Sequence, residues 1–334
     1  MKYEVTLLPQ VLFYQAFIIP MKKSILYLLI SICLFVACTP KPKPFPSQGL
    51  NNLADSMEFV LQKNQFYIEE PKSGEWLERN KERGQTFTEY WNKNTNISPI
   101  RATEQRRKIY LQLYGNFDKT QLRLMDSVER FLSIFYELPI ERLAQKKLDS
   151  TNLDTTNWRV HSRNGFQVKT GFILDSLEKN LPEDGVLLVS FTTNDLYPNK
   201  KWSFVFGQAR LYNRVGVWSM ARFGDVEAMK DDIDIFNLAL KRTCKTAVHE
   251  IGHIFSLQHC VFYRCAMQGA NNLTEIDGHP SYFCPVCDAK IISNLNLPLS
   301  KRYENLAAFW KNQQQLETSN YYRKSALMIK RLEE

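Results

Sequence analysis

The stretch from His249 to His259 restricts the fold of this chain more than any other part of the sequence. It reads His-Glu-Ile-Gly-His-Ile-Phe-Ser-Leu-Gln-His. His249 and His253 are four residues apart, so on a helix their imidazoles lie one turn apart on one face and can bind a single zinc ion. His259 can reach the same metal only if the chain turns sharply where the helix ends. The sequence therefore predicts a long helix followed by a tight turn.

Glu250 adds a candidate catalytic group to this metal site. It directly follows the first ligand, where its carboxylate can take a proton from zinc-bound water, whose pKa is lowered toward ~7. Three protein ligands leave one position of a tetrahedral ion open, which is typical of catalytic zinc, whereas structural zinc has four. The pattern predicts hydrolysis of peptide bonds in a peptide or protein substrate, without a covalent acyl-enzyme.

Two other interpretations of the motif remain open. The histidines can be solvated or core residues that fall at this spacing by chance, although three of the five histidines in the chain occupy the three motif positions. The chain can also be a catalytically inactive, zinc-stabilised binding module at a membrane surface. Glu250 argues against that module, because binding zinc does not require this carboxylate. His161 and His279 are interpreted as ordinary polar residues.

Four cysteines follow the motif as two short-spaced pairs, which are Cys260 with Cys265 and Cys284 with Cys287. Two such pairs separated by a loop are typical of a structural zinc site with four thiolate ligands. Disulfide bonds are the alternative in an oxidising compartment, but they do not explain why the cluster adjoins His259. We therefore predict two zinc ions per chain, one catalytic and one structural. Cys244 lies on the apolar stripe of the predicted helix and is expected to be a buried thiol.

The N-terminal region resembles a targeting signal. Met21 is followed by two lysines, Ile25 to Ala37 is apolar, and Cys38 stands where a bacterial lipoprotein signal has its lipidated cysteine. A transmembrane anchor is the alternative, but this apolar run is shorter than the roughly 20 residues that a membrane span needs. We expect translation to start at Met21, lipid attachment at Cys38, and a protein anchored to the membrane in the periplasm or cell envelope.

The order of strands and helices along the chain predicts a mixed α/β (α+β) domain. The 44% hydrophobic content is ordinary for a globular protein, and the net charge of +8 comes without a basic run interleaved with aromatics, so a nucleic-acid partner is not expected. Alternating or continuous apolar residues predict strands at 107–117, 185–191, 202–206 and 215–221. Helical spacing predicts helices around 124–135, over 169–181 and over 231–256.

These predictions divide the chain into four parts. They are a signal region at 1–37, a proline-rich tether at 38–50, a metallopeptidase domain at 51–300 and a helical extension at 301–334. The oligomeric state is not predicted.

The cysteine spacing and several upstream segments together resemble the archaemetzincins, a family of zinc metallopeptidases. The similar segments include Gly74-Glu75-Trp76-Leu77, Gly84-Gln85-Thr86-Phe87 and the region from Trp202 to Ala209, so the resemblance covers roughly 72–290. It implies a metzincin-like catalytic domain with a mixed β-sheet, with the active-site helix beneath a cleft and with an edge strand near Gly207 that pairs with substrate. It also implies Met267 as an apolar floor under the metal, and an aminopeptidase preference.

Ser256 departs from the pattern of this family, which has glycine at the corresponding position. Glycine suits a helix end where the chain turns back through positive φ. The resemblance therefore implies that Ser256 adopts this strained conformation, at a cost of about 1 kcal/mol or more. Glu275 and Asp277 match acidic positions of the family without a role that the sequence can supply.

Overall fold

The computed structural model describes residues 52–63, 67–96, 102–162, 165–295 and 299–333. The signal region, the tether and Cys38 lie outside these residues. Within the described part, none of the helices combines the length and apolar character that a membrane span requires.

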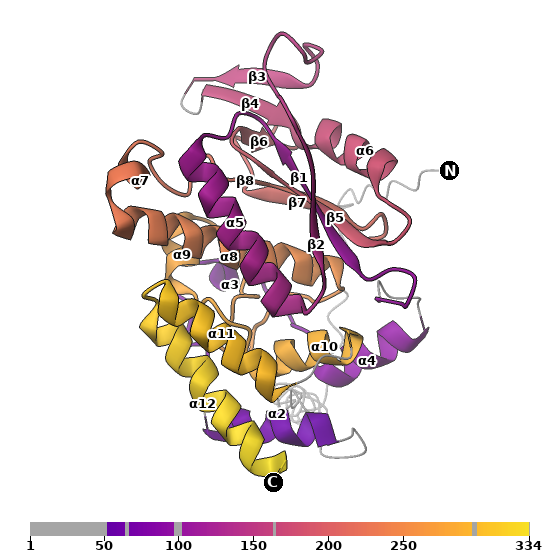
Figure 1. The fold of residues 1–334 in the computed structure, drawn as a ribbon, viewed down its shortest axis with the longest axis vertical. Coiled ribbons are helices and arrows are strands. Elements are labelled where there is room, and N and C mark those ends of the chain that lie inside the picture. The colour runs from indigo at the N-terminus through magenta and orange to yellow at the C-terminus, as the bar shows by residue number, and fades with distance from the viewer. Residues whose placement is uncertain (1–51, 64–66, 97–101, 163–164, 296–298, 334) are drawn as a thin grey trace, which may run out of the picture. The chain divides into compact units, whose positions relative to one another are not determined.

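The larger sheet has five strands in the order β2-β1-β5-β8-β7 (Figure 1). Its strands are β1 (Lys108–Tyr114), β2 (Ile140–Lys146), β5 (Gly185–Thr192), β7 (Gly207–Arg210) and β8 (Val215–Ser219). The first four in spatial order run parallel, and β7 pairs with β8 antiparallel at the edge. This mixed sheet and its covering helices confirm the predicted α/β class.

The side chains of β1 show why both faces of the sheet are covered. Ile109, Leu111 and Leu113 face one hydrophobic core, while Tyr110 and Tyr114 face a second. Helices α5 (Lys119–Tyr136) and α8 (Ile233–Ile254) cover the first face, and α6 (Thr170–Asn180) covers the second. Because alternate residues of a strand point to opposite faces, a nearly continuous apolar strand belongs in the middle of such a sandwich.

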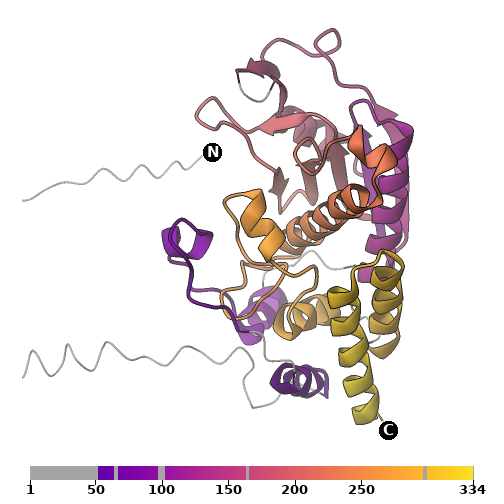
Figure 2. The same cartoon turned by 90° about the vertical axis from the view of Figure 1, so that its left-hand side faces the viewer.

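A smaller sheet and several further helices complete the described chain. The smaller sheet has the order β3-β4-β6, formed by β3 (Trp158–His161), β4 (Gly165–Lys169) and β6 (Asp195–Tyr197). The remaining helices are α2 (Asn52–Lys63), α3 (Trp76–Arg79), α4 (Phe87–Asn96), α7 (Ala228–Asp231), α9 (Leu273–Gly278), α10 (Pro285–Leu295), α11 (Ser300–Asn312) and α12 (Leu316–Glu333). Helices α11 and α12 lie side by side and bury aromatic residues in the first core (Figure 2).

The strand predicted at 202–206 is wrong, because β7 begins only at Gly207. Backbone pairing with neighbouring strands begins only near the end of the segment, where the Val205 amide donates to the carbonyl of Leu196 and the Phe206 carbonyl accepts from the amide of Ser219. At the start of the segment, side chains bind the backbone instead. The Arg159 guanidinium donates to the carbonyls of Trp202, at 2.6 Å, and Ser203, at 3.0 Å. The rings of Phe204 and Phe206 meet edge-on with their centres 5.3 Å apart, and the Arg222 guanidinium lies 3.6 Å from the centre of the Phe204 ring.

The helix predicted over 231–256 is interrupted at its start. Asp232 has an extended backbone, and its side chain accepts hydrogen bonds from the amides of Asp234 and Ile235. An aspartate that caps a helix in this way satisfies amides that have no partner within the helix. Helix α8 therefore begins at Ile233, and the preceding turn forms the separate short helix α7.

Candidate metal centre and catalytic site

Helix α8 places the first two histidines on one of its faces. Its opposite face is apolar and buried, with Leu240, Cys244 and Ile251 in the first core. The Nε2 atoms of His249 and His253 lie only 3.0 Å apart. The expected helical geometry and the buried position of Cys244 are thus both present.

The end of α8 has the conformation that returns the chain to the metal site. Ser256 has φ = 68°, its amide donates to the carbonyl of His253, and the amide of Leu257 donates to the carbonyl of Gly252. These two hydrogen bonds form a Schellman motif, in which a left-handed residue ends the helix. The His259 ring consequently lies with its centre 5.3 Å from that of His249 and 4.9 Å from that of His253.

The hydrogen bonds of the three imidazoles fit them for a metal ion. The Nδ1 atom of His249 lies 2.8 Å from the carbonyl oxygen of Ala266, and that of His253 lies 2.8 Å from the carbonyl oxygen of Leu257. A carbonyl can only accept, so both Nδ1 atoms carry the proton and both Nε2 atoms are acceptors. Two acceptors 3.0 Å apart repel unless a cation lies beside them, and neutral imidazole with a free Nε2 is the form that binds zinc.

Burial keeps the three histidines in this neutral form. It lowers the pKa of His249, His253 and His259, because the charged imidazolium is poorly solvated inside the protein. One potential ligand atom from each ring lies within 4.8 Å of the others. The donor set and its spacing therefore fit a zinc ion held by three histidines.

Glu250 is suited to act as a base beside this centre. Burial raises the pKa of its carboxyl group to about 7, against weaker opposing effects from Trp218 and His259. A base whose pKa is close to neutral can both take up and return a proton at physiological pH. A cavity of about 80 Å³ lies next to it, lined in part by His249, Glu250 and Phe206.

The four cysteines of the downstream loop form a second candidate metal centre. Their Sγ atoms all lie within 4.8 Å of one another, and all four cysteines are free thiols, so the disulfide alternative is not formed in this structure. Backbone amides of Met267 and Cys284 point at the sulfur of Cys265, at 3.4 and 3.1 Å. Such amides stabilise thiolates, and four buried sulfurs at this spacing fit a tetrahedral zinc ion.

Met267 connects the two centres. Its carbonyl accepts from the amide of Cys260, and its buried side chain packs against α8 at Gly252. A Cβ atom at Gly252 would lie 2.6 Å from the Met267 sulfur, so glycine is required for this close approach. The position under the histidine helix agrees with the apolar floor that the sequence resemblance implies for Met267.

The sequence did not reveal the roles of several residues that support the site. Both carboxylate oxygens of Glu82 lie close to Nδ1 of His259, at 2.9 and 3.0 Å. Glu275 accepts from the amides of Trp76 and Asn271, and Asp277 forms an ion pair with Arg242 of α8. Glu275 and Asp277 thus hold in place the loop 260–287 that carries the four cysteines (the cysteine loop). This explains the two acidic positions for which the sequence supplied no role.

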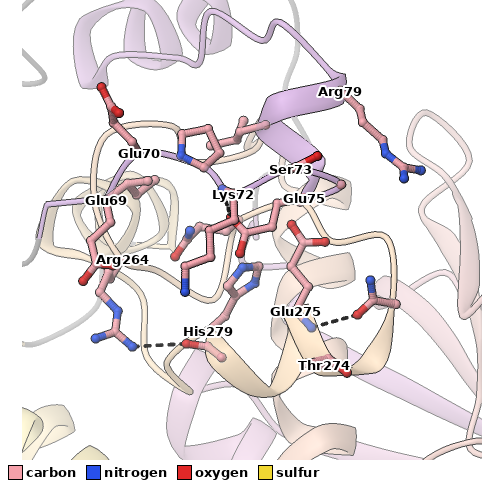
Figure 3. A pocket seen from close by; sticks show the side chains of 18 residues that line it. Glu69, Glu70, Lys72, Ser73, Glu75, Arg79, Arg264, Thr274, Glu275 and His279 are labelled. Carbon is pink, nitrogen blue, oxygen red and sulfur yellow. Dashed lines mark hydrogen bonds between the residues drawn. The ribbon is translucent and has the colours of Figure 1, made fainter.

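A larger cavity of about 810 Å³ lies between the segment 68–79 and the cysteine loop (Figure 3). Figure 3 shows Lys72 and Glu75 from the N-terminal segment facing Glu275 and His279 of the loop. Gln268 and His279 line both this cavity and the smaller one beside Glu250. The candidate catalytic site therefore adjoins a space large enough for several substrate residues.

Comparison with known proteins identifies the family. The model of peptidase family M54 matches residues 108–293, which is more than half of the chain. The chain is an archaemetzincin. The archaemetzincin-2 proteins of Homo sapiens and Mus musculus are each 33% identical to it, over 260 and 259 residues. Both alignments cover 70% of this chain and 71% of the relative.

Solved archaemetzincin structures are also similar to the chain. That of Methanopyrus kandleri has a TM-score of 0.45 at 27% identity and covers 58% of this chain and 98% of its own. That of Archaeoglobus fulgidus, complexed with malonate, has a TM-score of 0.42 at 26% identity and covers 55% of this chain and 99% of its own. As a family member, the chain is a zinc metallopeptidase, and its substrate is a peptide or protein.

Proposed function

We propose that this archaemetzincin hydrolyses peptide bonds with Glu250 as general base and with His249, His253 and His259 as ligands of the catalytic zinc. The observation that carries the proposal is the convergence of the three imidazoles next to the Glu250 carboxylate. A zinc ion held by these three histidines would supply a Lewis acid for the scissile carbonyl and would lower the pKa of a bound water. Glu250 takes the proton from the attacking water and then delivers it to the leaving amine.

The position of β7 supports a binding mode for the substrate. This strand is at the edge of the larger sheet, and an extended peptide can pair with the outer side of such a strand. Phe206, just before β7, lines the cavity beside Glu250. Substrate paired along β7 would therefore pass next to the general base. The proposal that cleavage occurs next to a free N-terminus rests on family analogy alone, and peptides with free and acetylated N-termini test it.

The decisive experiment compares the wild type with Glu250→Gln on a mixed peptide library. Glu250→Gln should lose peptide cleavage and keep its zinc, because the substitution removes the base and leaves the ligands. Glu227→Gln provides a matched control, since the Glu227 side chain is 81% exposed. Equal cleavage by the wild type and Glu250→Gln would refute the mechanism. Zinc binding without any cleavage by the wild type would instead support an inactive binding module.

We also propose that Cys260, Cys265, Cys284 and Cys287 hold a second, structural zinc. Metal analysis should find close to two zinc ions per wild-type chain. Cys284→Ala should reduce this number to one, while Cys244→Ala should leave it unchanged, because Cys244 is buried elsewhere on α8. One zinc per wild-type chain, together with disulfides among the four cysteines, would contradict the two-site proposal.

The membrane anchor is a separate proposal, supported by the sequence around Cys38. The chain should be lipidated at Cys38 and held at a bacterial membrane in the periplasm or cell envelope. Cys38→Ala should lose labelling by a fatty-acid analogue and move to the soluble fraction. Unchanged labelling would show that the anchor lies elsewhere.

A further inference from the structure

The N-terminal segment 67–96 packs against the third histidine of the candidate catalytic site. It lies ahead of residues 108–293, which the family model matches. Its short helix α3 and the loop after it approach the cysteine loop and the end of α8 (Figure 2). The segment therefore adds contacts to the metal centre from outside the matched region.

Glu82 makes the most direct of these contacts. Its two carboxylate oxygens lie 2.9 and 3.0 Å from Nδ1 of His259. A carboxylate can only accept, so Nδ1 donates and the Nε2 atom of His259 is left for a metal. His249 and His253 use backbone carbonyls for the same purpose, whereas His259 depends on a charged side chain from a segment far away in the sequence.

Two further residues of the segment hold the turn that carries His259. The side chain of Gln85 donates to the carbonyl of Ser256 and accepts from the amide of Gln258. The ring of Trp76 meets the His259 ring edge-on, with centres 5.1 Å apart. Trp76 fits there because Gly269 has no side chain, since a Cβ atom would lie 2.5 Å from the indole.

We propose that Glu82 is a positioning residue for the third zinc ligand. Its carboxylate fixes the tautomer and orientation of His259 and makes Nε2 a stronger donor, as carboxylates behind metal-bound histidines do. Its negative charge also favours a cation among three neutral imidazoles. The N-terminal segment is therefore part of the metal centre, and this inference rests on the proposed assignment of His259 as a ligand.

Zinc affinity is the main test, measured on the full-length chain in detergent by competition with a chromophoric chelator. Glu82→Ala should weaken binding at the histidine site by about 10- to 100-fold. Glu82→Gln should lie between Glu82→Ala and the wild type, because its amide oxygen still accepts from Nδ1 but carries no charge. Glu104→Ala, which removes an exposed carboxylate from the same half of the chain, should bind zinc like the wild type.

Cobalt substitution separates a positioning role from a general loss of structure. The d–d absorption of cobalt at the histidine site should change in both Glu82 variants, while the thiolate charge-transfer bands of the cysteine site should not. In peptide cleavage by zinc-saturated protein, kcat should fall more than KM rises. Failure of the wild type to cleave peptides would refute the proposed function, but the zinc and cobalt measurements would still test Glu82.

Wild-type zinc affinity and an unchanged cobalt spectrum in Glu82→Ala would overturn the proposal. Loss of the cysteine-site bands in both Glu82 variants would also overturn it, because it would assign Glu82 a role in folding. If Glu82→Ala alone is unstable, the nearly isosteric Glu82→Gln decides between these outcomes.

Discussion

The guanidinium of Arg302 forms a two-point ion pair with the carboxylate of Asp288, at 2.9 and 3.0 Å, and both side chains are buried. Arg302 also donates to the carbonyl of Phe135, and the hydroxyl of Tyr303 donates to Asp288. Asp288 follows Cys287 on α10, so this cluster ties the C-terminal helices to the candidate thiolate centre.

Arg302→Met should therefore destabilise the protein by about 3–5 kcal/mol, because it leaves a buried carboxylate unpaired. The double variant Arg302→Met with Asp288→Leu should be less destabilised than the single variant. Lys301→Met is the control, since its ion pair with Glu304 is exposed, and it should change stability by less than about 0.5 kcal/mol. The free energy of unfolding of all three variants can be measured by urea denaturation monitored by circular dichroism. Equal losses in Arg302→Met and Lys301→Met would show that the buried pair is unimportant.

Ser256→Gly should stabilise the fold. Ser256 has φ = 68°, a conformation that costs a residue with a side chain about 1–2 kcal/mol, while glycine adopts it readily. The greater freedom of glycine in the unfolded chain offsets part of this gain, so the expected increase is up to about 1 kcal/mol. Ser256→Ala keeps the strain and should show no comparable gain. A loss of stability in Ser256→Gly, measured by urea unfolding, would refute this account.

Gly207→Ala should impair both stability and catalysis. A Cβ atom at Gly207 would lie 2.0 Å from Cδ1 of Trp218, which is fully buried next to Glu250. The overpacking should cost about 1–3 kcal/mol and lower kcat/KM, because either β7 or Trp218 must move. Gly171→Ala is the matched control, since its Cβ atom meets nothing within 4 Å. Wild-type kinetics and stability in Gly207→Ala would contradict the prediction.

Lys245 should make stability rise with pH above neutrality. Burial lowers the pKa of this lysine to about 7, from 10.5 in its ordinary state. Between these two values the unfolded chain binds more protons than the native protein, so raising the pH favours the native protein. The free energy of unfolding of the wild type should therefore increase relative to that of Lys245→Met between pH 7 and about 10, with a slope of up to about 1.4 kcal/mol per pH unit.

Lys301→Met is the control for this pH dependence, because the Lys301 side chain is 71% exposed. Its stability should follow the wild type across the same pH range. Parallel curves for the wild type and Lys245→Met would show that Lys245 does not titrate as expected.

The sequence predicts the parts of the site that depend on local spacing. The helical pair His249 and His253 follows from a spacing of four, and the resemblance to the archaemetzincins implies the positive φ of Ser256. Both predictions are confirmed by the geometry of α8 and its end. The sequence also predicts β1 from the alternation of its apolar residues and β5 from a continuous apolar run, which is typical of a strand in the middle of a sheet.

Long-range contacts of polar side chains are not visible in the same way. Glu82 and His259 are separated by 177 positions, and nothing in the sequence around Glu82 indicates a partner. The only signal was indirect, because the two segments of family resemblance at 74–77 and 84–87 lie on either side of Glu82. The edge strand β2 is not predicted for a related reason. It is only partly buried, so its sequence lacks a clear apolar pattern.

His259 and Cys260 are neighbours in the chain, so one short turn belongs to both proposed zinc sites. The amide of Cys260 donates to the carbonyl of Met267, and Nδ1 of His249 donates to the carbonyl of the preceding residue, Ala266. Metal binding at either site restricts the same backbone and so reduces the entropy lost at the other. Zinc uptake should then be cooperative. At limiting zinc, singly loaded chains should be fewer than two independent sites would give, whereas at saturating metal each site should still fill when the other is impaired.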